Sequence, residues 1–214
     1  MTSDALQMHI QSGTKRIEKV QLDGRTVWIK RPETLGPWMR LLKGDPDQAF
    51  AREVRAHQAL ADKGLAVAPI LSIGPDHIAT EDSGRSLLQP MRNWSDDSAD
   101  LLRHAARALA ELHGAGEAHG RPSLKDMLWK DGRITFIDFE RAGRSRDIAR
   151  AQEMDALMFV FNVCAETGGA EEAMTIARDT YRAAQPDIWA RAETRLRRFL
   201  PLKWALTPLI PFLG

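Results

Sequence analysis

The segment that most constrains the fold of this chain spans residues 119–142 and reads HGRPSLKDMLWKDGRITFIDFERA. We predict a short hairpin over 127–137, which ends at Asp138 among apolar residues. A carboxylate at the end of a buried strand is costly unless it is paired or bound to a metal. The segment therefore predicts that Asp138 is a metal ligand, and the alternative is a turn aspartate that closes the hairpin.

The first third of the chain has the patterns of strands and one helix. We predict strands over 6–31, with a hairpin that turns at Asp23-Gly24 between RIEKVQL and RTVWIK. Residues 32–46 contain three prolines and two glycines and are predicted to be irregular. Apolar residues recur at helical spacing over 46–63, and PILSIG, HIATED and RSLLQPM are predicted as short strands.

The rest of the chain has mainly helical patterns. Ser95 and the two aspartates after it can cap a long helix over 98–115. Three further helices are predicted, over 147–167, 169–184 and 187–200. This order of elements predicts an α+β fold of two lobes. The first, 1–90, holds a small antiparallel sheet and the helix 46–63, and the second, 91–214, is mostly helical.

Charge and hydropathy exclude several classes of protein. Of the 214 residues, 43% are hydrophobic, which is enough for a full core. Thirty basic and twenty-nine acidic side chains leave a net charge of +1, so we expect no nucleic-acid partner. The chain has no apolar run of about 18 residues and no signal-peptide pattern. Its single cysteine, Cys164, cannot form an internal disulfide. We expect a monomeric, cytoplasmic protein.

Further candidate residues occur in a fixed order along the chain. Lys30 ends the predicted strand VWIK, Glu53 lies in the next helix, and Asp126 precedes Asp138 by 12 residues. Carboxylate oxygens are ligands that suit Mg²⁺. A strand lysine held by a helix glutamate can bind phosphates. Taken alone, however, Lys30 and Glu53 are better read as solvated side chains.

The motifs VWIK, LHGAGEAHG, KDMLW and FIDFERA together resemble the protein-kinase-like superfamily. The nearest resemblance, over about residues 20–165, is to small bacterial lipopolysaccharide-core and Kdo sugar kinases and to aminoglycoside and choline phosphotransferases. It implies a two-lobed kinase-like fold, a catalytic-loop-like segment at 119–140, and ATP and Mg²⁺ as cofactors. The implied site residues are Lys30 and Glu53 for the ATP phosphates, Glu81 and Asp82 beside adenine, and Asp126 and Asp138 for Mg²⁺.

Arg121 departs from this resemblance, because these families have the catalytic aspartate at its position. It precedes Asp126 by 5 residues, the offset between base and metal ligand in kinase loops. Arginine cannot accept a proton, but it can stabilise phosphate charge or bind an anionic substrate. We therefore group Arg121 with Asp138 as candidate catalytic residues. His119 is predicted to be a buried scaffold residue rather than a base, and Asp155 is predicted to support the loop.

Two further departures bear on the acceptor and on nucleotide binding. The phosphate-covering loop of kinases is reduced to Ser12-Gly13-Thr14, between the first predicted strands. The segment after Asp138 is too short to dock a peptide, which favours a small-molecule or glycolipid acceptor. An arginine run follows that either binds a phosphorylated sugar or is a solvated charge run, and it consists of Arg141, Arg144, Arg146 and Arg150.

The C-terminal segment 195–214 alternates basic and bulky apolar residues. Residues 191–214 hold five basic groups and one acid, a local net charge of +4. This composition suits peripheral contact with an anionic membrane such as the inner membrane. Packing of the segment as the last core element fits the sequence equally well.

Two functions are compatible with these residues. The first is ATP- and Mg²⁺-dependent phosphotransfer to a lipopolysaccharide-core sugar or another small acceptor. The second is a pseudokinase that binds a nucleotide or a partner and regulates envelope biogenesis without catalysis. The lysine and carboxylates favour the first, whereas Arg121 and the reduced phosphate loop favour the second.

Overall fold

The N-terminal part of the chain forms a four-stranded antiparallel sheet. The computed structural model describes residues 4–143 and 145–206. The strands of this sheet, in spatial order, are β1 (Ile17–Leu22), β2 (Arg25–Lys30), β4 (His77–Glu81) and β3 (Ile70–Gly74). The predicted first hairpin is confirmed, because β1 and β2 pair around a turn at Asp23 and Gly24 in which both residues have positive φ.

A second antiparallel sheet contains the predicted hairpin of the 119–142 segment. Its strands are β5 (Arg85–Ser86), β6 (Met127–Lys130) and β7 (Arg133–Phe136), in that order, and the turn η1 (Leu124–Asp126) precedes β6. The segment after the first long helix joins this sheet, since Phe136 donates its backbone N–H to the Ala66 carbonyl and forms a parallel bridge with Val67. Backbone hydrogen bonds therefore connect the N-terminal part to the second sheet.

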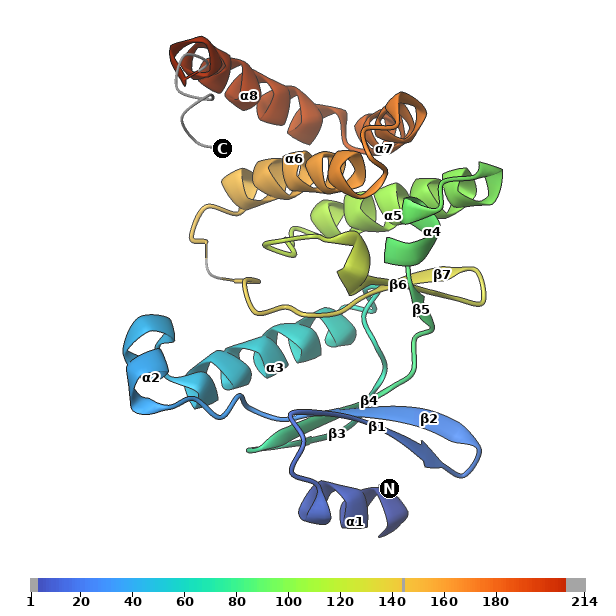
Figure 1. The fold of residues 1–214 in the computed structure, drawn as a ribbon, viewed down its shortest axis with the longest axis vertical. Coiled ribbons are helices and arrows are strands. Elements are labelled where there is room, and N and C mark those ends of the chain that lie inside the picture. The colour runs from blue at the N-terminus through green and yellow to red at the C-terminus, as the bar shows by residue number, and fades with distance from the viewer. Residues whose placement is uncertain (1–3, 144, 207–214) are drawn as a thin grey trace.

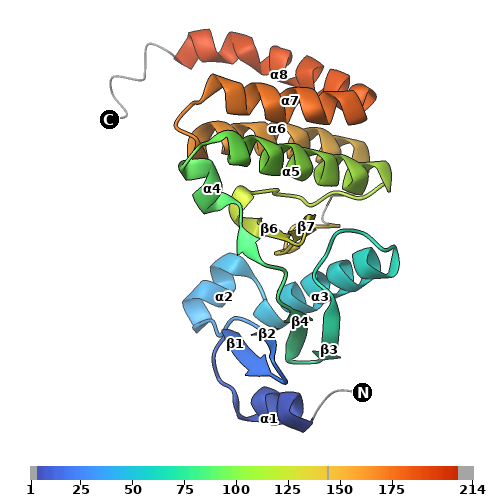
Figure 2. The same ribbon diagram turned by 90° about the vertical axis from the view of Figure 1, so that its right-hand side faces the viewer.

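The long helices lie close to their predicted positions. Helix α3 (Pro46–Asp62) begins at Asp45, whose side chain accepts from the Asp47 N–H. The other long helices are α5 (Asp96–Gly114), α6 (Ile148–Glu166), α7 (Glu171–Ala184) and α8 (Pro186–Leu206). Figures 1 and 2 show these four helices stacked at the end opposite the four-stranded sheet, with the second sheet between. The α+β class is confirmed.

Three short helices correct the predicted secondary structure: α1 (Asp4–Ser12), α2 (Pro37–Lys43) and α4 (Leu88–Arg92). The prediction of strands from residue 6 was wrong because Leu6 and Ile10, four residues apart, form the buried face of a helix. Residues 32–46 are not wholly irregular, since Pro37 and Gly44 stand at the ends of α2 instead of preventing it. Helix α4 replaces most of the predicted strand RSLLQPM.

The position predicted for the reduced phosphate loop was also wrong. Gly13 follows helix α1 rather than a strand, and its N–H donates to the His9 carbonyl. A Cβ at Gly13 would overlap the Arg31 guanidinium, the Glu18 carboxylate and the His9 carbonyl. Gly13 is thus a tightly packed residue at a helix end, and its amide already has an acceptor.

The buried apolar residues form one large cluster and two small ones. The large cluster lies among α5, α6, α7 and the second sheet, and Leu102, Leu109 and Phe136 are fully buried in it. A smaller cluster between α1 and the first sheet contains Val27 and Ile29, and a third lies under α3. Within the described part of the chain, no helix is long and apolar enough to cross a bilayer.

Candidate functional site

The structure brings Lys30, Glu53 and Asp138 together from three separate elements. Lys30 ends β2, Glu53 lies in α3, and Asp138 follows β7. The Lys30 Nζ donates to Glu53 Oε1 at 2.5 Å and lies 3.6 Å from Asp138 Oδ1. All three side chains are mostly buried. The reading of Lys30 and Glu53 as solvated residues was therefore wrong.

Local sequence explains why Glu53 points into this group. Phe50, Val54 and His57 bury one face of α3, and the His57 ring bonds the Ala68 carbonyl through Nε2. Glu53 lies beside this face, close enough to the sheet to meet Lys30. Burial raises the pKa of Glu53 although Lys30 acts in the opposite direction. The lysine is thus the main group that stabilises the ionised glutamate.

Asp138 has an unusual backbone and an incomplete set of partners. Its φ of 67° lies in the left-handed region, which is uncommon for a residue other than glycine. Its buried Oδ1 has no hydrogen-bond partner among the described residues. Carboxylate oxygens of Asp138, Glu53 and Glu140 lie within 4.8 Å of one another. Carboxylate oxygens are ligands that suit Mg²⁺, and Lys30 already offsets part of this charge, because its Nζ contacts Glu53 Oε1 and lies 3.6 Å from Asp138 Oδ1.

Glu140 was missing from the predicted site. It is the glutamate of the FIDFERA motif, and its position two residues after Asp138 was the available signal. Its carboxylate also lies 3.7 Å from Arg16. The sequence could not show that the backbone after Asp138 turns so that both carboxylates approach Glu53.

Asp126 is buried close to this group but is not one of the three clustered carboxylates. Its backbone carbonyl accepts from the Ile137 N–H, which places it beside the strand end that carries Asp138. Burial raises the pKa of Asp126 to about 6; Lys125 opposes the shift and the charge of Asp138 adds to it. Lys125 Nζ lies 3.9 Å from Asp126 Oδ1, so the lysine only partly offsets the cost of burying this carboxylate.

Arg121 lies at the edge of the group. Its Nη2 is 3.8 Å from Asp138 Oδ2, and its side chain is 42% exposed. Gly120, just before it, has a φ of 88°, and a Cβ there would overlap the backbone of Arg141. Glycine is therefore required where the loop passes the segment after Asp138. A cavity of about 460 Å³ beside Arg121 is lined also by Ser123, Lys125, Asp126, Phe161 and Asn162.

The predicted supporting roles of His119 and Asp155 are confirmed. The Asp155 carboxylate accepts from the backbone N–H of His119 at 2.7 Å and of Gly120 at 3.0 Å. His119 is buried, and its Nε2 is 3.1 Å from the Ile137 carbonyl. Burial lowers the pKa of His119, which favours the neutral ring of a scaffold residue. Asn162 of α6 adds a contact that the sequence did not suggest, because its Oδ1 accepts from Leu124 N–H.

Glu81 and Asp82 lie apart from the lysine–carboxylate group. Their backbone N–H groups donate to the carbonyls of Pro69 and Thr26, and Asp82 Oδ1 accepts from Trp28 Nε1 at 2.7 Å. They line a cavity of about 860 Å³ whose wall includes neither Lys30 nor Asp138. The predicted role of these two residues beside adenine stays a prediction.

Two predicted basic segments fall partly outside the described residues. Arg141, Arg146 and Arg150 are exposed beyond Asp138, whereas Arg144 lies outside the described part of the chain. Of the segment 195–214, helix α8 reaches Leu206, and the described pairs join Arg195 to Glu153 and Arg197 to Glu193. Residues 207–214 lie outside the description. Membrane contact through this segment therefore stays a prediction.

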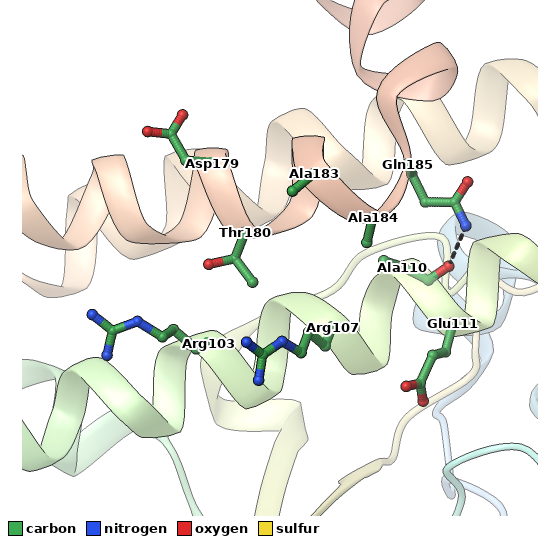
Figure 3. A pocket seen from close by; sticks show the side chains of 9 residues that line it. All are labelled: Arg103, Arg107, Ala110, Glu111, Asp179, Thr180, Ala183, Ala184 and Gln185. Atoms are coloured by element: carbon green, nitrogen blue, oxygen red, sulfur yellow. Dashed lines mark hydrogen bonds between the residues drawn. The ribbon is translucent and has the colours of Figure 1, made fainter.

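A further groove lies between α5 and α7, away from the lysine–carboxylate group. Figure 3 shows Arg103 and Arg107 of α5 below Thr180 of α7, with Gln185 donating to the Ala110 carbonyl at one end. Arg103 is already paired with Asp100 at 2.7 Å. The groove has a volume of about 700 Å³, and its lining includes none of the lysine–carboxylate residues, so we assign it no role in the site.

The fold and the site define an α+β protein in which a lysine and several carboxylates meet between a sheet, a helix and a hairpin. No family model matches the chain. The chain is 30% identical over 204 residues to an uncharacterized protein of Haemophilus influenzae (strain ATCC 51907 / DSM 11121 / KW20 / Rd), covering 92% of this chain and 82% of that protein. It belongs to the same family as this Haemophilus protein.

Proposed function

We propose that this protein is an ATP- and Mg²⁺-dependent phosphotransferase with a two-lobed kinase-like fold. The observation that carries the proposal is the position of Lys30, which contacts Glu53 at 2.5 Å and lies 3.6 Å from Asp138. A kinase site needs this combination, because the lysine binds phosphates and the aspartate binds the metal. Asp138 Oδ1 is buried and accepts no hydrogen bond among the described residues, which supports the same assignment.

Each residue of the site has a role in this proposal. Lys30 binds the α- and β-phosphates of ATP, and Glu53 fixes the direction of its ammonium group. Asp138 and Asp126 would hold Mg²⁺, which neutralises charge on the transferred phosphoryl group. Arg121 replaces the usual catalytic aspartate and contributes positive charge near that group. Because little proton movement occurs early in phosphoryl transfer, the reaction can proceed without a general base. Loss of the base lowers the rate by about 10²–10⁴-fold.

The acceptor is proposed to be a small molecule or a glycolipid such as a lipopolysaccharide-core sugar. The cavity beside Arg121 has two cationic side chains, Arg121 and Lys125, one carboxylate, Asp126, and an apolar wall that includes Phe161. Such a cavity suits an anionic acceptor with an apolar part. The short segment after Asp138 leaves little surface for a peptide.

A pseudokinase that regulates envelope biogenesis is the second candidate. Arg121 lies 3.8 Å from Asp138 Oδ2 and partly neutralises a carboxylate that a metal would need. Gly13, the glycine of the reduced phosphate loop, is packed at a helix end. Both features favour binding of a nucleotide or a partner without turnover.

Thermal-shift titration with ATP and Mg²⁺ tests both candidates. We expect wild-type protein to be stabilised by ATP only when Mg²⁺ is present, and Asp138→Ala to lose that shift. Asp62→Ala, at the exposed C-terminal end of α3, is the matched control. Absence of a shift in the wild type would reject both candidates. Binding without phosphate transfer to any core-sugar acceptor would favour the pseudokinase.

A further inference from the structure

Arg16 is held beside the end of the strand that carries Lys30. It is the last residue before β1, and its carbonyl accepts from the Arg31 N–H at 2.7 Å. The next residue, Ile17, pairs with Lys30 in the register of β1 and β2. The buried Arg31 guanidinium also donates to the Lys15 carbonyl at 2.9 Å. The backbone at residues 15 and 16 is therefore fixed next to this strand end.

The side chain of Arg16 reaches the rim of the lysine–carboxylate group. Its Nη2 lies 3.7 Å from Glu140 Oε1, and its Nη1 lies 4.0 Å from Glu33 Oε1. Both separations are longer than a hydrogen bond, and the guanidinium donates no hydrogen bond to any residue that the structure describes. The side chain is 44% exposed. Because Glu140 lies with Glu53 and Asp138, a half-exposed cation borders these carboxylates.

The chemistry of a guanidinium indicates which ligand it would bind at this place. Arginine presents planar N–H donors that match pairs of phosphate oxygens, and it stays protonated. Exposed ion pairs at 3.7 and 4.0 Å contribute little to stability, so stability is a weak reason for an arginine here. Gly13, in the same segment, already donates its N–H to the His9 carbonyl. Arg16, unlike Gly13, therefore has donors available to a phosphate.

We propose that Arg16 binds the terminal phosphates of the polyphosphate group that Lys30 holds. The inference rests on the proposed function, which supplies the nucleotide as the source of this polyphosphate. Glu140 attracts the guanidinium while the carboxylates are free of metal. A cation on the Glu140 carboxylate repels Arg16, which then turns to the phosphates. Arg16 and a cation therefore compete for Glu140, whereas Arg16 and Lys30 act together on the phosphates.

Calorimetric titration of the full chain with inorganic tripolyphosphate and with ATP, both in the presence of Mg²⁺, tests the proposal. We expect Arg16→Gln to raise the Kd of both ligands at least about tenfold. Arg16→Lys should raise it less, because the charge remains and only the paired donors are lost. The matched control is Arg103→Gln, which changes an arginine of α5 with a 41% exposed side chain and one acidic partner. Equal Kd values for wild type and Arg16→Gln would overturn the proposal.

Comparison of the two ligands separates this inference from the proposed function. If tripolyphosphate binds in an Arg16-dependent way and ATP does not bind, the role of Arg16 is supported and the nucleotide is rejected. If both ligands bind and neither depends on Arg16, the proposed function stands and the role of Arg16 is rejected. If neither ligand binds to the wild type, both are rejected.

Titration with Mg²⁺ alone, without any phosphate, should give a result of the opposite sign. We expect Arg16→Gln to bind Mg²⁺ at least about threefold more tightly than the wild type, because a competing positive charge near Glu140 is removed. Thermal unfolding of the same variant identifies a merely structural ion pair. A lower melting temperature with unchanged affinities for Mg²⁺ and tripolyphosphate would overturn the proposal.

Discussion

At the scale of single residues, the buried carboxyl group of Asp126 is costly to ionise in the folded protein. Burial raises its pKa from 3.8 to about 6, so the unfolded chain releases this proton at a lower pH than the folded protein does. The folded state therefore binds more protons between about pH 4 and pH 6. The contribution of Asp126 to the free energy of unfolding therefore falls as the pH rises through this window, and it stays low at higher pH.

Asp126→Asn should therefore stabilise the metal-free protein at neutral pH. We expect the free energy of unfolding at pH 7 to rise by roughly 2 kcal/mol, and the gain to shrink toward pH 4, where the carboxyl group is neutral in the folded protein. Urea unfolding at a series of pH values measures this. Asp131→Asn, in an exposed turn, is the control, and a gain that does not depend on pH would contradict the explanation.

Spacing along the chain could place the residues of the site only where one short segment contains them, whereas the pairing of Lys30 with Glu53 was predicted from the family resemblance. Arg121, Asp126 and Asp138 lie on a single loop and hairpin, so their proximity follows from the sequence. The contact of Lys30 with Glu53 depends on how α3 packs against β2, and residue spacing contains no information about that packing. The backbone hydrogen bonds of Glu81 and Asp82 likewise depend on how the strands pair and on the position of the Pro69 carbonyl.

At the scale of elements, helix length decided which predictions were right. Helices α3, α5, α6, α7 and α8 repeat an apolar spacing over several turns, so their positions could be predicted closely. Helices α1 and α2 have only about two turns each, too few to separate helical spacing from alternation. In α2 the apolar face is not even directed at the core, so periodicity could not indicate burial.

Helix α6 should be needed to hold the loop before the hairpin. Asp155→Asn removes the charge that accepts from the N–H groups of His119 and Gly120. We expect the free energy of unfolding to fall by roughly 3 kcal/mol, because hydrogen bonds to a buried charge are lost. Urea unfolding measures this loss, and the control is Asp100→Asn, which changes an exposed residue of α5. A loss no larger than in that control would show that α6 does not brace the loop.

At the scale of the whole molecule, the division of the core predicts unequal stability. The first sheet rests on small clusters, whereas α5 lies in the large one. Native-state hydrogen exchange should therefore show weaker protection in β1 and β2 than in α5. Ile29→Ala should weaken protection in the sheet alone, and Leu102→Ala should weaken it in α5. Equal loss of protection along the chain in Ile29→Ala would mean that the clusters unfold together.

Only Gly44 and Asp45 separate α2 from α3. Helix α3 is held along its whole length, because Pro46, Phe50 and Val54 are buried toward its N-terminus and the His57–Ala68 bond holds its C-terminal half. Glu53 lies near the middle of this helix, which is about 25 Å long at a rise of about 1.5 Å per residue. A displacement of α2 would therefore reach Glu53 only if α3 shifts as a rigid body, and such a shift would move the glutamate relative to Lys30.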